Sequence, residues 1–343
     1  MVRHAGLFLF FFTLVCFLSL FRPLHAAAYM DDHKAQLLSE TQQLLFNNRF
    51  DSADSLQRDF ARIYPDDPGC YLIQAAIEMA KMAFFEDNLY PDYAKLLDTL
   101  RMKAQMVSDS GSASTKSWMH LFVGHSKAYG SIRESRFGSL YSAIRLGLAA
   151  KSEYEAGLAL DSSIYDHYMG IGTYHYWKSA KAGMLRWIGL FKNDRALGIK
   201  ELYIAADSAQ IFKESARSGL IWIWINKEKY DSAIAVAEEM QKAYPDGTSF
   251  LWPMAQAYFA KRDYVNTARI YRLIRDKIDD TPGNYFNLIE CDYFISKCLV
   301  ILERKDEAIA AARDFAVYQK QIPNSTYNRQ KSHISFLRKL VLE

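Results

Sequence analysis

Phe50-Asp51-Ser52-Ala53, followed by Tyr64-Pro65-Asp66, is a pattern that the chain uses twice. The second copy reads Tyr230-Asp231-Ser232-Ala233, and Tyr244-Pro245-Asp246 follows it at the same interval of eleven residues after the alanine. Tyr264 lies thirty-four residues beyond Tyr230 and opens another segment of the same shape. Recurrence at a fixed period of roughly 20 to 50 residues is typical of repeat proteins, in which each unit packs on its neighbours. The sequence therefore predicts an array of repeated units.

The repeated segments have the hydrophobic pattern of helices. Their apolar residues recur three and four positions apart, as they do along the buried face of an α-helix. Proline or Asp-Ser separates one unit from the next, and no stretch shows the sustained alternation that strands need. The fold class predicted from the sequence is all-α.

A period of thirty-four also makes the chain resemble the tetratricopeptide repeat family, whose units pair one helix carrying Trp-x2-Leu-Gly-x2-Tyr with a second carrying Ala, an aromatic residue and Pro. The small residue of the first helix lies where the paired helix crosses closest, because a larger side chain would hold the backbones apart. The residues that carry this resemblance are Phe137-Gly138-x2-Tyr141 with Ala150 and Tyr154, Tyr168-x2-Ile171-Gly172-x2-His175, Leu220 and Trp224 with Ala233 and Pro245, Leu251, Ala255 and Tyr258 with Tyr271, and Ser296 and Leu299 with Ala308 and Ala312.

The resemblance implies a right-handed α-α superhelix, a tetratricopeptide-like solenoid of about seven helix pairs over residues 34–320. A C-terminal helix at 326–342 is expected to cap the last apolar face. Residues 29–107 are expected to form N-terminal helical repeats, 108–117 a serine-rich linker, and 118–343 the longer array.

The fourth unit carries about twelve extra residues, near 178–189, between its two helices. Residues 170–202 resemble the mitochondrial outer-membrane and inclusion-body-clearance group of tetratricopeptide proteins, although the prolines of that group are missing and Asn193 replaces a usual glycine. The stretch 178–191 is apolar with interspersed lysine and arginine, a composition that suits a membrane surface. An alternative function is therefore a peripheral envelope protein that contacts membrane or lipid through residues 178–191, with Trp187 and Leu190 as the contact residues. The competing interpretation of this stretch is a helical hairpin packed on its neighbours.

Residues 1–28 have the order of a secretory signal peptide. Arg3 precedes an apolar run from Leu7 to Phe21, and Ala26-x-Ala28 offers a cleavage site. We expect export to a bacterial periplasm or envelope after cleavage near Ala26 to Ala28. The alternative is a lipoprotein anchored through Cys16, although Val15 stands where a small residue should precede the lipidated cysteine.

Charge and cysteine content narrow the function classes. The net charge of +3 comes from 42 basic and 39 acidic residues that are interspersed, so nothing favours nucleic-acid binding. Cys70, Cys291 and Cys298 remain after cleavage, an odd number that cannot form a disulfide framework. Buried thiols are the main interpretation, and a bridge from Cys70 to one of the others is the alternative.

The sequence lacks the strongest catalytic signatures, including phosphate loops, nucleophile elbows and metalloprotease motifs. Gly170-Ile-Gly172 lies within a predicted helix and lacks a third glycine, which favours helix packing over dinucleotide binding. His120 with His125, and His167 with His175, do not have the spacing that puts two imidazoles on one metal. Asp194-Arg195 is interpreted as a helix N-terminal acid and an ion pair. We predict no enzyme activity, no cofactor and no metal, with an all-helical enzyme without a recognisable motif as an alternative.

The resemblance places ligands on the first helices of the units, which line a concave face in that family. Tryptophan and tyrosine offer large contact areas, and amides satisfy a peptide backbone. The expected function is a non-catalytic scaffold that binds a peptide or protein partner in this groove, although Trp222 and Trp224 are equally interpretable as packing residues. The predicted partner-binding residues are Met169, Thr173, Tyr176, Trp177, Trp222, Asn226, Trp252, Gln256 and Phe259.

Overall fold

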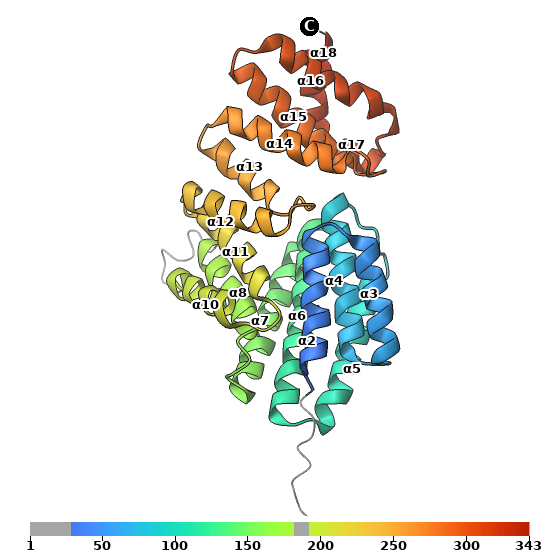
Figure 1. Ribbon diagram of the computed structural model, residues 1–343, viewed down its shortest axis with the longest axis vertical. Helices are drawn as coiled ribbons and strands as arrows, with labels where there is room; N and C mark the ends of the chain where they lie inside the picture. Colours follow the sequence, from blue (N-terminus) through green and yellow to red (C-terminus); the bar gives the residue numbers. More distant parts are fainter. Residues whose placement is uncertain (1–28, 182–191, 343) are drawn as a thin grey trace, which may run out of the picture.

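The computed structural model describes residues 29–181 and 192–342, so the predicted signal peptide lies outside the described residues. Within those two ranges the chain forms sixteen α-helices and no strand, which confirms the all-α prediction. The helices rise from the N-terminal pairs at one end of an elongated molecule to the C-terminal helices at the other (Figure 1).

Fourteen of the helices form seven consecutive pairs. The first helices of the pairs are α2 (Asp32–Phe46), α4 (Pro68–Phe85), α6 (Ala113–Phe137), α8 (His167–Lys181), α11 (Lys213–Asn226), α13 (Leu251–Ala260) and α15 (Tyr285–Ile301). Their partners are α3 (Phe50–Ile63), α5 (Tyr93–Ser110), α7 (Leu140–Leu160), α10 (Arg195–Ser208), α12 (Tyr230–Ala243), α14 (Tyr264–Ile278) and α16 (Lys305–Tyr318). The short α17 (Asn324–Arg329) leads into α18 (Lys331–Leu342).

Every pair packs on the next one in the same way. The second helix of each pair contacts the first helix of the following pair, and the first helices also contact one another in a row from α2 through α4, α6, α8 and α11 to α13. At the end of the chain, α18 packs on both α15 and α16 and buries Ile334, Leu337 and Leu340. The C-terminal helix therefore covers the last pair.

The turn between the two helices of a pair is also repeated. Asn48, Glu228, Arg262 and Glu303 each end a first helix with a left-handed backbone, at φ between 57° and 62°. The next backbone N–H then bonds the carbonyl five residues back, as in Arg49 to Leu44 and Lys229 to Trp224. This is the hydrogen bond of a Schellman ending, which satisfies carbonyls left open at a helix C-terminus. Glu228 and Arg262 are thirty-four residues apart, so the period of the sequence is also a period of the backbone.

Three predicted boundaries differ from the structure. The single capping helix expected at 326–342 is divided at Gln330, where α17 ends and α18 begins. Phe137-Gly138-x2-Tyr141 was expected to lie within a first helix, but residues 140–160 form one continuous helix and Gly138 lies in the turn before it. The first helix of that pair is α6, and its small residue is Gly124, which faces the ring of Tyr154. In the predicted serine-rich linker at 108–117, only Gly111 and Ser112 separate α5 from α6.

The three cysteines outside the signal region are free and buried, as their main interpretation expected. Burial raises the pKa of Cys70 to about 11 and that of Cys298 to about 12. These thiols are therefore protonated packing groups at neutral pH, and the alternative of a Cys70 bridge is wrong.

The N-terminal pairs also contact the chain much further along. We call the contact between residues 46–50 and residues 244–250 the seam. The ring of Phe46 lies 5.2 Å from that of Tyr244 and 5.1 Å from that of Phe250. Asn48 Nδ2 donates to Thr248 Oγ1 at 3.2 Å across 200 residues of sequence. Further along the same edge, Asn287 Nδ2 donates to the carbonyl of Phe84 at 2.6 Å, and α4 contacts α15.

Gly247 allows the backbones to approach at the seam, and Gly247→Ala is expected to open it. A Cβ at this position would lie 1.7 Å from the carbonyl oxygen of Phe46, which is part of the backbone and cannot rotate away. We expect a loss of about 2 kcal/mol in the free energy of unfolding, together with faster hydrogen exchange in α2. Gly147→Ala is the control, because its Cβ would meet only Ser131 Oγ at 3.4 Å. Unchanged exchange in α2 would show that the seam does not depend on this contact.

Candidate functional site

The predicted partner-binding residues lie on α8, α11 and α13, three first helices that contact one another in succession. Met169, Thr173 and Trp177 on α8 are half-buried. Thr173 Oγ1 donates to the carbonyl of Met169 at 2.7 Å, a hydrogen bond within α8. The ring of Trp177 lies on the cluster formed by Leu202, Leu220 and their neighbours, with Lys181 Nζ 5.9 Å from its centre.

Tyr176 has a different place from the one predicted. Its side chain is fully buried between α8 and α11, so it presents no surface to a partner. Its hydroxyl donates to Asn226 Oδ1 at 2.8 Å, and burial raises its pKa, which keeps it a neutral donor. The Asn226 side chain itself is exposed. Tyr176 thus acts as a positioning residue that holds one end of an exposed amide.

On α11 and α13 the aromatic residues are half-buried and the amides are exposed. Trp222 and Trp252 each keep part of their surface in solvent, while Asn226 and Gln256 are open. The ring of Trp252 packs edge-on against Tyr271 at 6.0 Å. Trp222 and Trp252 thus both pack inside the array and keep some exposed surface. They are neither fully buried packing residues nor free surface residues.

The same surface continues onto α15. The ring of Phe259 on α13 lies 5.1 Å from that of Phe294, and Lys297 Nζ lies 5.5 Å from the Phe259 ring centre. Lys297 Nζ also lies over the Tyr293 ring at 5.1 Å and donates to its hydroxyl at 2.9 Å.

Sequence reasoning missed Tyr293 and Lys297, although the signal was present. They stand three residues before and one residue after Ser296, as Trp252 and Gln256 stand around Ala255. We call the half-buried and exposed side chains that follow this register the first-helix face. It comprises Met169, Thr173, Trp177, Trp222, Asn226, Trp252, Gln256, Phe259, Tyr293 and Lys297.

The predicted insertion lies between α8 and α10, and Trp187 and Leu190 fall outside the described residues. At its two ends, Lys178 Nζ and Asp194 Oδ2 form an ion pair at 2.7 Å. Asp194 immediately precedes α10, and the hydrogen bond from Lys178 holds the pKa of this carboxyl below its usual value. This confirms the interpretation of Asp194 as a helix N-terminal acid in an ion pair.

The histidines have separate structural partners. His120 and His175 bond Glu153 and Glu201 through their Nδ1 atoms, each at 2.7 Å. His125 is buried, and its Nδ1 bonds the carbonyl of Leu121 at 3.0 Å while Nε2 has no partner. His167 is buried against Ser117 Oγ at 3.0 Å. Burial lowers the pKa of His125 to about 4 and that of His167 to about 3, so both rings are neutral at pH 7.

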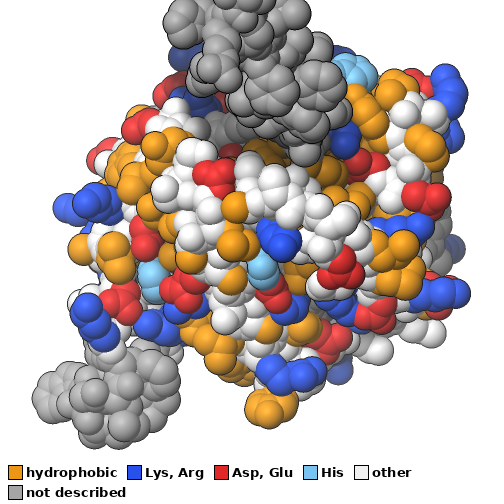
Figure 2. Space-filling view, turned by 90° about the horizontal axis from the view of Figure 1, so that it is seen from below, with side chains coloured by type: hydrophobic (Ala, Val, Ile, Leu, Met, Phe, Trp, Pro, Cys, Tyr) orange, Lys and Arg blue, Asp and Glu red, His pale blue; other side chains and the backbone are white. Residues whose placement is uncertain are grey.

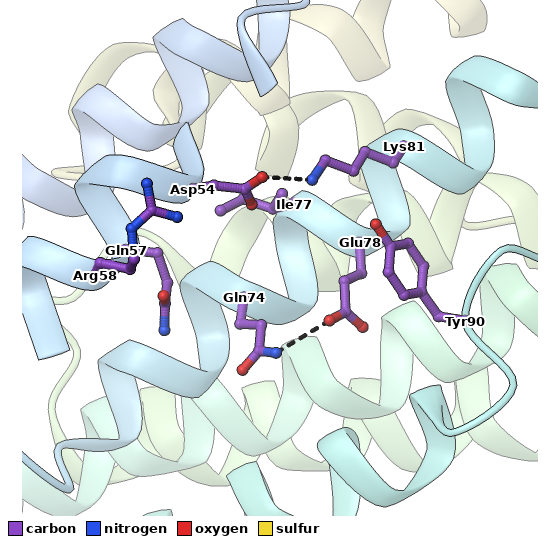
Figure 3. A pocket seen from close by; sticks show the side chains of 8 residues that line it. All are labelled: Asp54, Gln57, Arg58, Gln74, Ile77, Glu78, Lys81 and Tyr90. Carbon is purple, nitrogen blue, oxygen red and sulfur yellow. Dashed lines mark hydrogen bonds and ion pairs between the residues drawn. The ribbon is translucent and has the colours of Figure 1, made fainter. Parts of the chain in front are cut away.

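A polar pocket of about 240 Å³ lies between α3 and α4 (Figure 3). Asp54 and Lys81 point toward each other and form an ion pair at 2.6 Å, and Gln74 Nε2 donates to Glu78 Oε1 at 3.1 Å. Burial raises the pKa of Glu78, beside which Tyr90 lies. Two acidic residues, Asp54 and Glu78, and two basic residues, Arg58 and Lys81, line the pocket, so its charge shows no net preference for an anion or a cation.

The remaining surface carries no block of one charge on the face seen from below, where acidic, basic and hydrophobic side chains alternate (Figure 2). In residues 29–181 and 192–342, no three His, Cys, Asp or Glu side chains gather as a metal site would need. None of the helices described has both the length and the hydrophobicity to cross a membrane. No protein-family model and no curated protein matches the sequence.

Proposed function

We propose that the seven helix pairs form a right-handed superhelix of the tetratricopeptide kind and that the protein is a non-catalytic scaffold for a partner protein. The first-helix face binds an extended peptide segment of that partner. The observation that carries this proposal is the continuous row of first helices, because α8, α11 and α13 bring the predicted residues onto neighbouring elements. The repeated Schellman turns and the covering helix α18 support the repeat architecture.

The chemistry of the face suits an extended peptide. Exposed amides at Asn226 and Gln256 can each donate and accept hydrogen bonds with a peptide backbone. The half-buried rings of Trp222, Trp252 and Phe259 offer apolar contact area with few rotatable bonds to fix. Asn226 is also held by Tyr176, so less of its freedom is lost on binding. Export to the periplasm or envelope, as the first twenty-eight residues suggest, is part of the same proposal.

Peptide selection tests the face. Random twelve-residue peptides displayed on phage are selected against the purified protein, and the affinity of a selected peptide is measured by fluorescence anisotropy. Trp222→Ala and Asn226→Ala are each expected to weaken binding by at least about tenfold, as the loss of an interface hot spot does. Tyr203→Ala on α10 is the control, since Tyr203 is exposed and lies on a second helix.

Two outcomes would overturn the proposal. One is a selection that returns no binding peptide. The other is a selected peptide that binds wild type, Trp222→Ala and Asn226→Ala equally well while circular dichroism shows both variants folded. Tyr176→Phe tests separately whether the hold on Asn226 matters for peptide affinity, because this variant keeps the buried ring and removes only the hydrogen bond to Asn226.

A further inference from the structure

The polar pocket between α3 and α4 contains a carboxylate and a guanidinium that no oppositely charged side chain neutralises. Glu78 on α4 accepts a hydrogen bond from the neutral amide of Gln74 at 3.1 Å, and Arg58 on α3 donates to the hydroxyl of Ser55 at 2.8 Å. Within residues 29–181 and 192–342, neither Glu78 nor Arg58 has a group of opposite charge within the 4.0 Å of an ion pair. Both side chains line the same pocket, so a ligand there meets two uncompensated charges of opposite sign.

The other two charged side chains of the pocket compensate each other. Asp54 and Lys81 form an ion pair at 2.6 Å, and Lys81 lies on the same helix as Glu78. Because this pair is neutral as a whole, the charges that select a ligand are those of Glu78 and Arg58.

The half-buried position of Glu78 favours a ligand that brings a positive charge. Burial raises the pKa of this carboxyl, because partial removal from water disfavours its charged form. A cationic group beside the carboxylate would offset that cost, whereas an uncharged ligand would exclude more water and add to it. An ammonium group is the matching chemistry, since it carries the right charge and donates up to three hydrogen bonds.

A simple cation does not complete the match, because Arg58 would repel it. A simple anion beside Arg58 would likewise face the carboxylate of Glu78. Figure 3 shows Arg58 and Glu78 on different sides of the pocket, Arg58 coming from α3 and Glu78 from α4. A molecule with an ammonium group at one end and a carboxylate at the other satisfies both, since a guanidinium can bind a carboxylate through two parallel hydrogen bonds.

The size of the pocket and its remaining lining suit a small molecule. Its volume of about 240 Å³ is below the roughly 300 to 1,000 Å³ of pockets that hold drug-sized ligands. Gln57 and Tyr90 add an amide and a hydroxyl that can donate or accept hydrogen bonds, and the buried Ile77 adds an apolar surface. The ligand that fits is compact and mainly polar.

We propose that this pocket binds a small zwitterion, an α-amino acid or a dipeptide, whose ammonium group pairs with Glu78 and whose carboxylate pairs with Arg58. The two kinds of molecule share this chemistry and differ in the separation of their charges. The pocket lies on the first two helix pairs, whereas the first-helix face lies on the fourth to seventh pairs. The two proposals therefore stand or fall independently.

Calorimetric titration of the purified protein tests the proposal and separates the two kinds of ligand. The protein is titrated with each α-amino acid found in proteins and with each corresponding glycyl dipeptide. At least one of these zwitterions is expected to bind. Its N-acetylated form, which lacks the ammonium group, and its C-terminal amide, which lacks the carboxylate, are each expected to bind at least about tenfold more weakly.

Two variants assign the charges of the ligand to the two side chains. Glu78→Gln and Arg58→Gln are each expected to weaken binding of the zwitterion at least about tenfold. In Glu78→Gln the zwitterion is also expected to lose its advantage over the N-acetylated form, and in Arg58→Gln its advantage over the amide. Misfolding would not produce this crossed pattern. Arg62→Gln is the control, because Arg62 is exposed on the same helix and pairs with Asp59 outside the pocket.

Three outcomes would overturn the proposal. The first is that no amino acid and no glycyl dipeptide binds. The second is a zwitterion that binds wild type, Glu78→Gln and Arg58→Gln equally well while circular dichroism shows both variants folded. The third is a ligand whose N-acetylated and amidated forms bind as tightly as the zwitterion itself.

Discussion

Gly198→Ala is expected to lower the free energy of unfolding by about 3 kcal/mol, because the glycine lies where α8 and α10 cross most closely. A Cβ on Gly198 would lie 2.6 Å from the carbonyl oxygen of Gly172 and 2.7 Å from the backbone nitrogen of Tyr176. A Cβ on Gly172 would in turn lie 2.7 Å from the carbonyl oxygen of Gly198. The atoms met are backbone atoms of a helix, so that the two helices must separate to admit a methyl group. Urea unfolding of wild type and variant measures the loss.

Gly219→Ala provides the matched control for this substitution. Gly219 is also within a helix, but a Cβ there would meet only Leu202 Cδ2, at 3.8 Å. Alanine is favoured over glycine in helices by about 1 kcal/mol, so this variant is expected to gain up to that amount. Equal stability changes in the two variants would show that the crossing does not need a glycine at 198.

Acidification is expected to destabilise the protein from about pH 6.5 downward, through the buried histidines. In the unfolded chain a histidine has a pKa of about 6.5, whereas burial lowers the pKa of His125 to about 4 and that of His167 to about 3. Between those values the unfolded chain binds protons that the folded chain does not, so stability is present above pH 6.5 and falls as the pH falls through the folded pKa values. His125 alone accounts for roughly 3 kcal/mol at pH 4.

His125→Phe isolates this contribution. The histidine ring stacks on Phe212 at 4.0 Å, and its Nε2 has no hydrogen-bond partner, so a phenyl ring fits the site and removes an unpaired polar atom. The variant and wild type are expected to differ little at pH 8, while the variant keeps roughly 3 kcal/mol more stability at pH 4. Denaturant unfolding across pH 4 to 8 gives both values, and parallel curves would exclude a role for His125.

The sequence alone was sufficient to predict the features that depend on residues close together along the chain. Apolar spacing and helix-breaking segments such as Tyr244-Pro245-Asp246 predict the helical structure, the seven pairs and the covering C-terminal segment. The prediction that glycines at 170–172 serve helix packing is confirmed by the contact of Gly172 with Gly198. The register of the third pair was wrong because Gly138 matches the repeat pattern in type but lies in a turn, where the pattern alone does not separate a helix crossing from a helix end.

The candidate site was only partly predictable, because exposure depends on residues far apart in sequence. The register gave the correct helices for Trp222, Asn226, Trp252 and Gln256, but it could not show that α11 buries Tyr176. The contact between Phe46 and Tyr244 could not be predicted either, since no pattern in the residues around one of them indicates that it packs against the other.

Because of the seam, the packing of the N-terminal pairs depends on residues that are synthesised much later. An array whose units contact only their neighbours can fold as each unit leaves the ribosome. Here the loop at 46–50 finds its partner about 200 residues later, which at roughly 5 to 20 residues per second means a delay of roughly 10 to 40 seconds. During that interval the ring of Phe46 has neither Tyr244 nor Phe250 to cover it. Packing of the N-terminal pairs is therefore complete only after the segment between the fifth and sixth pairs has been synthesised.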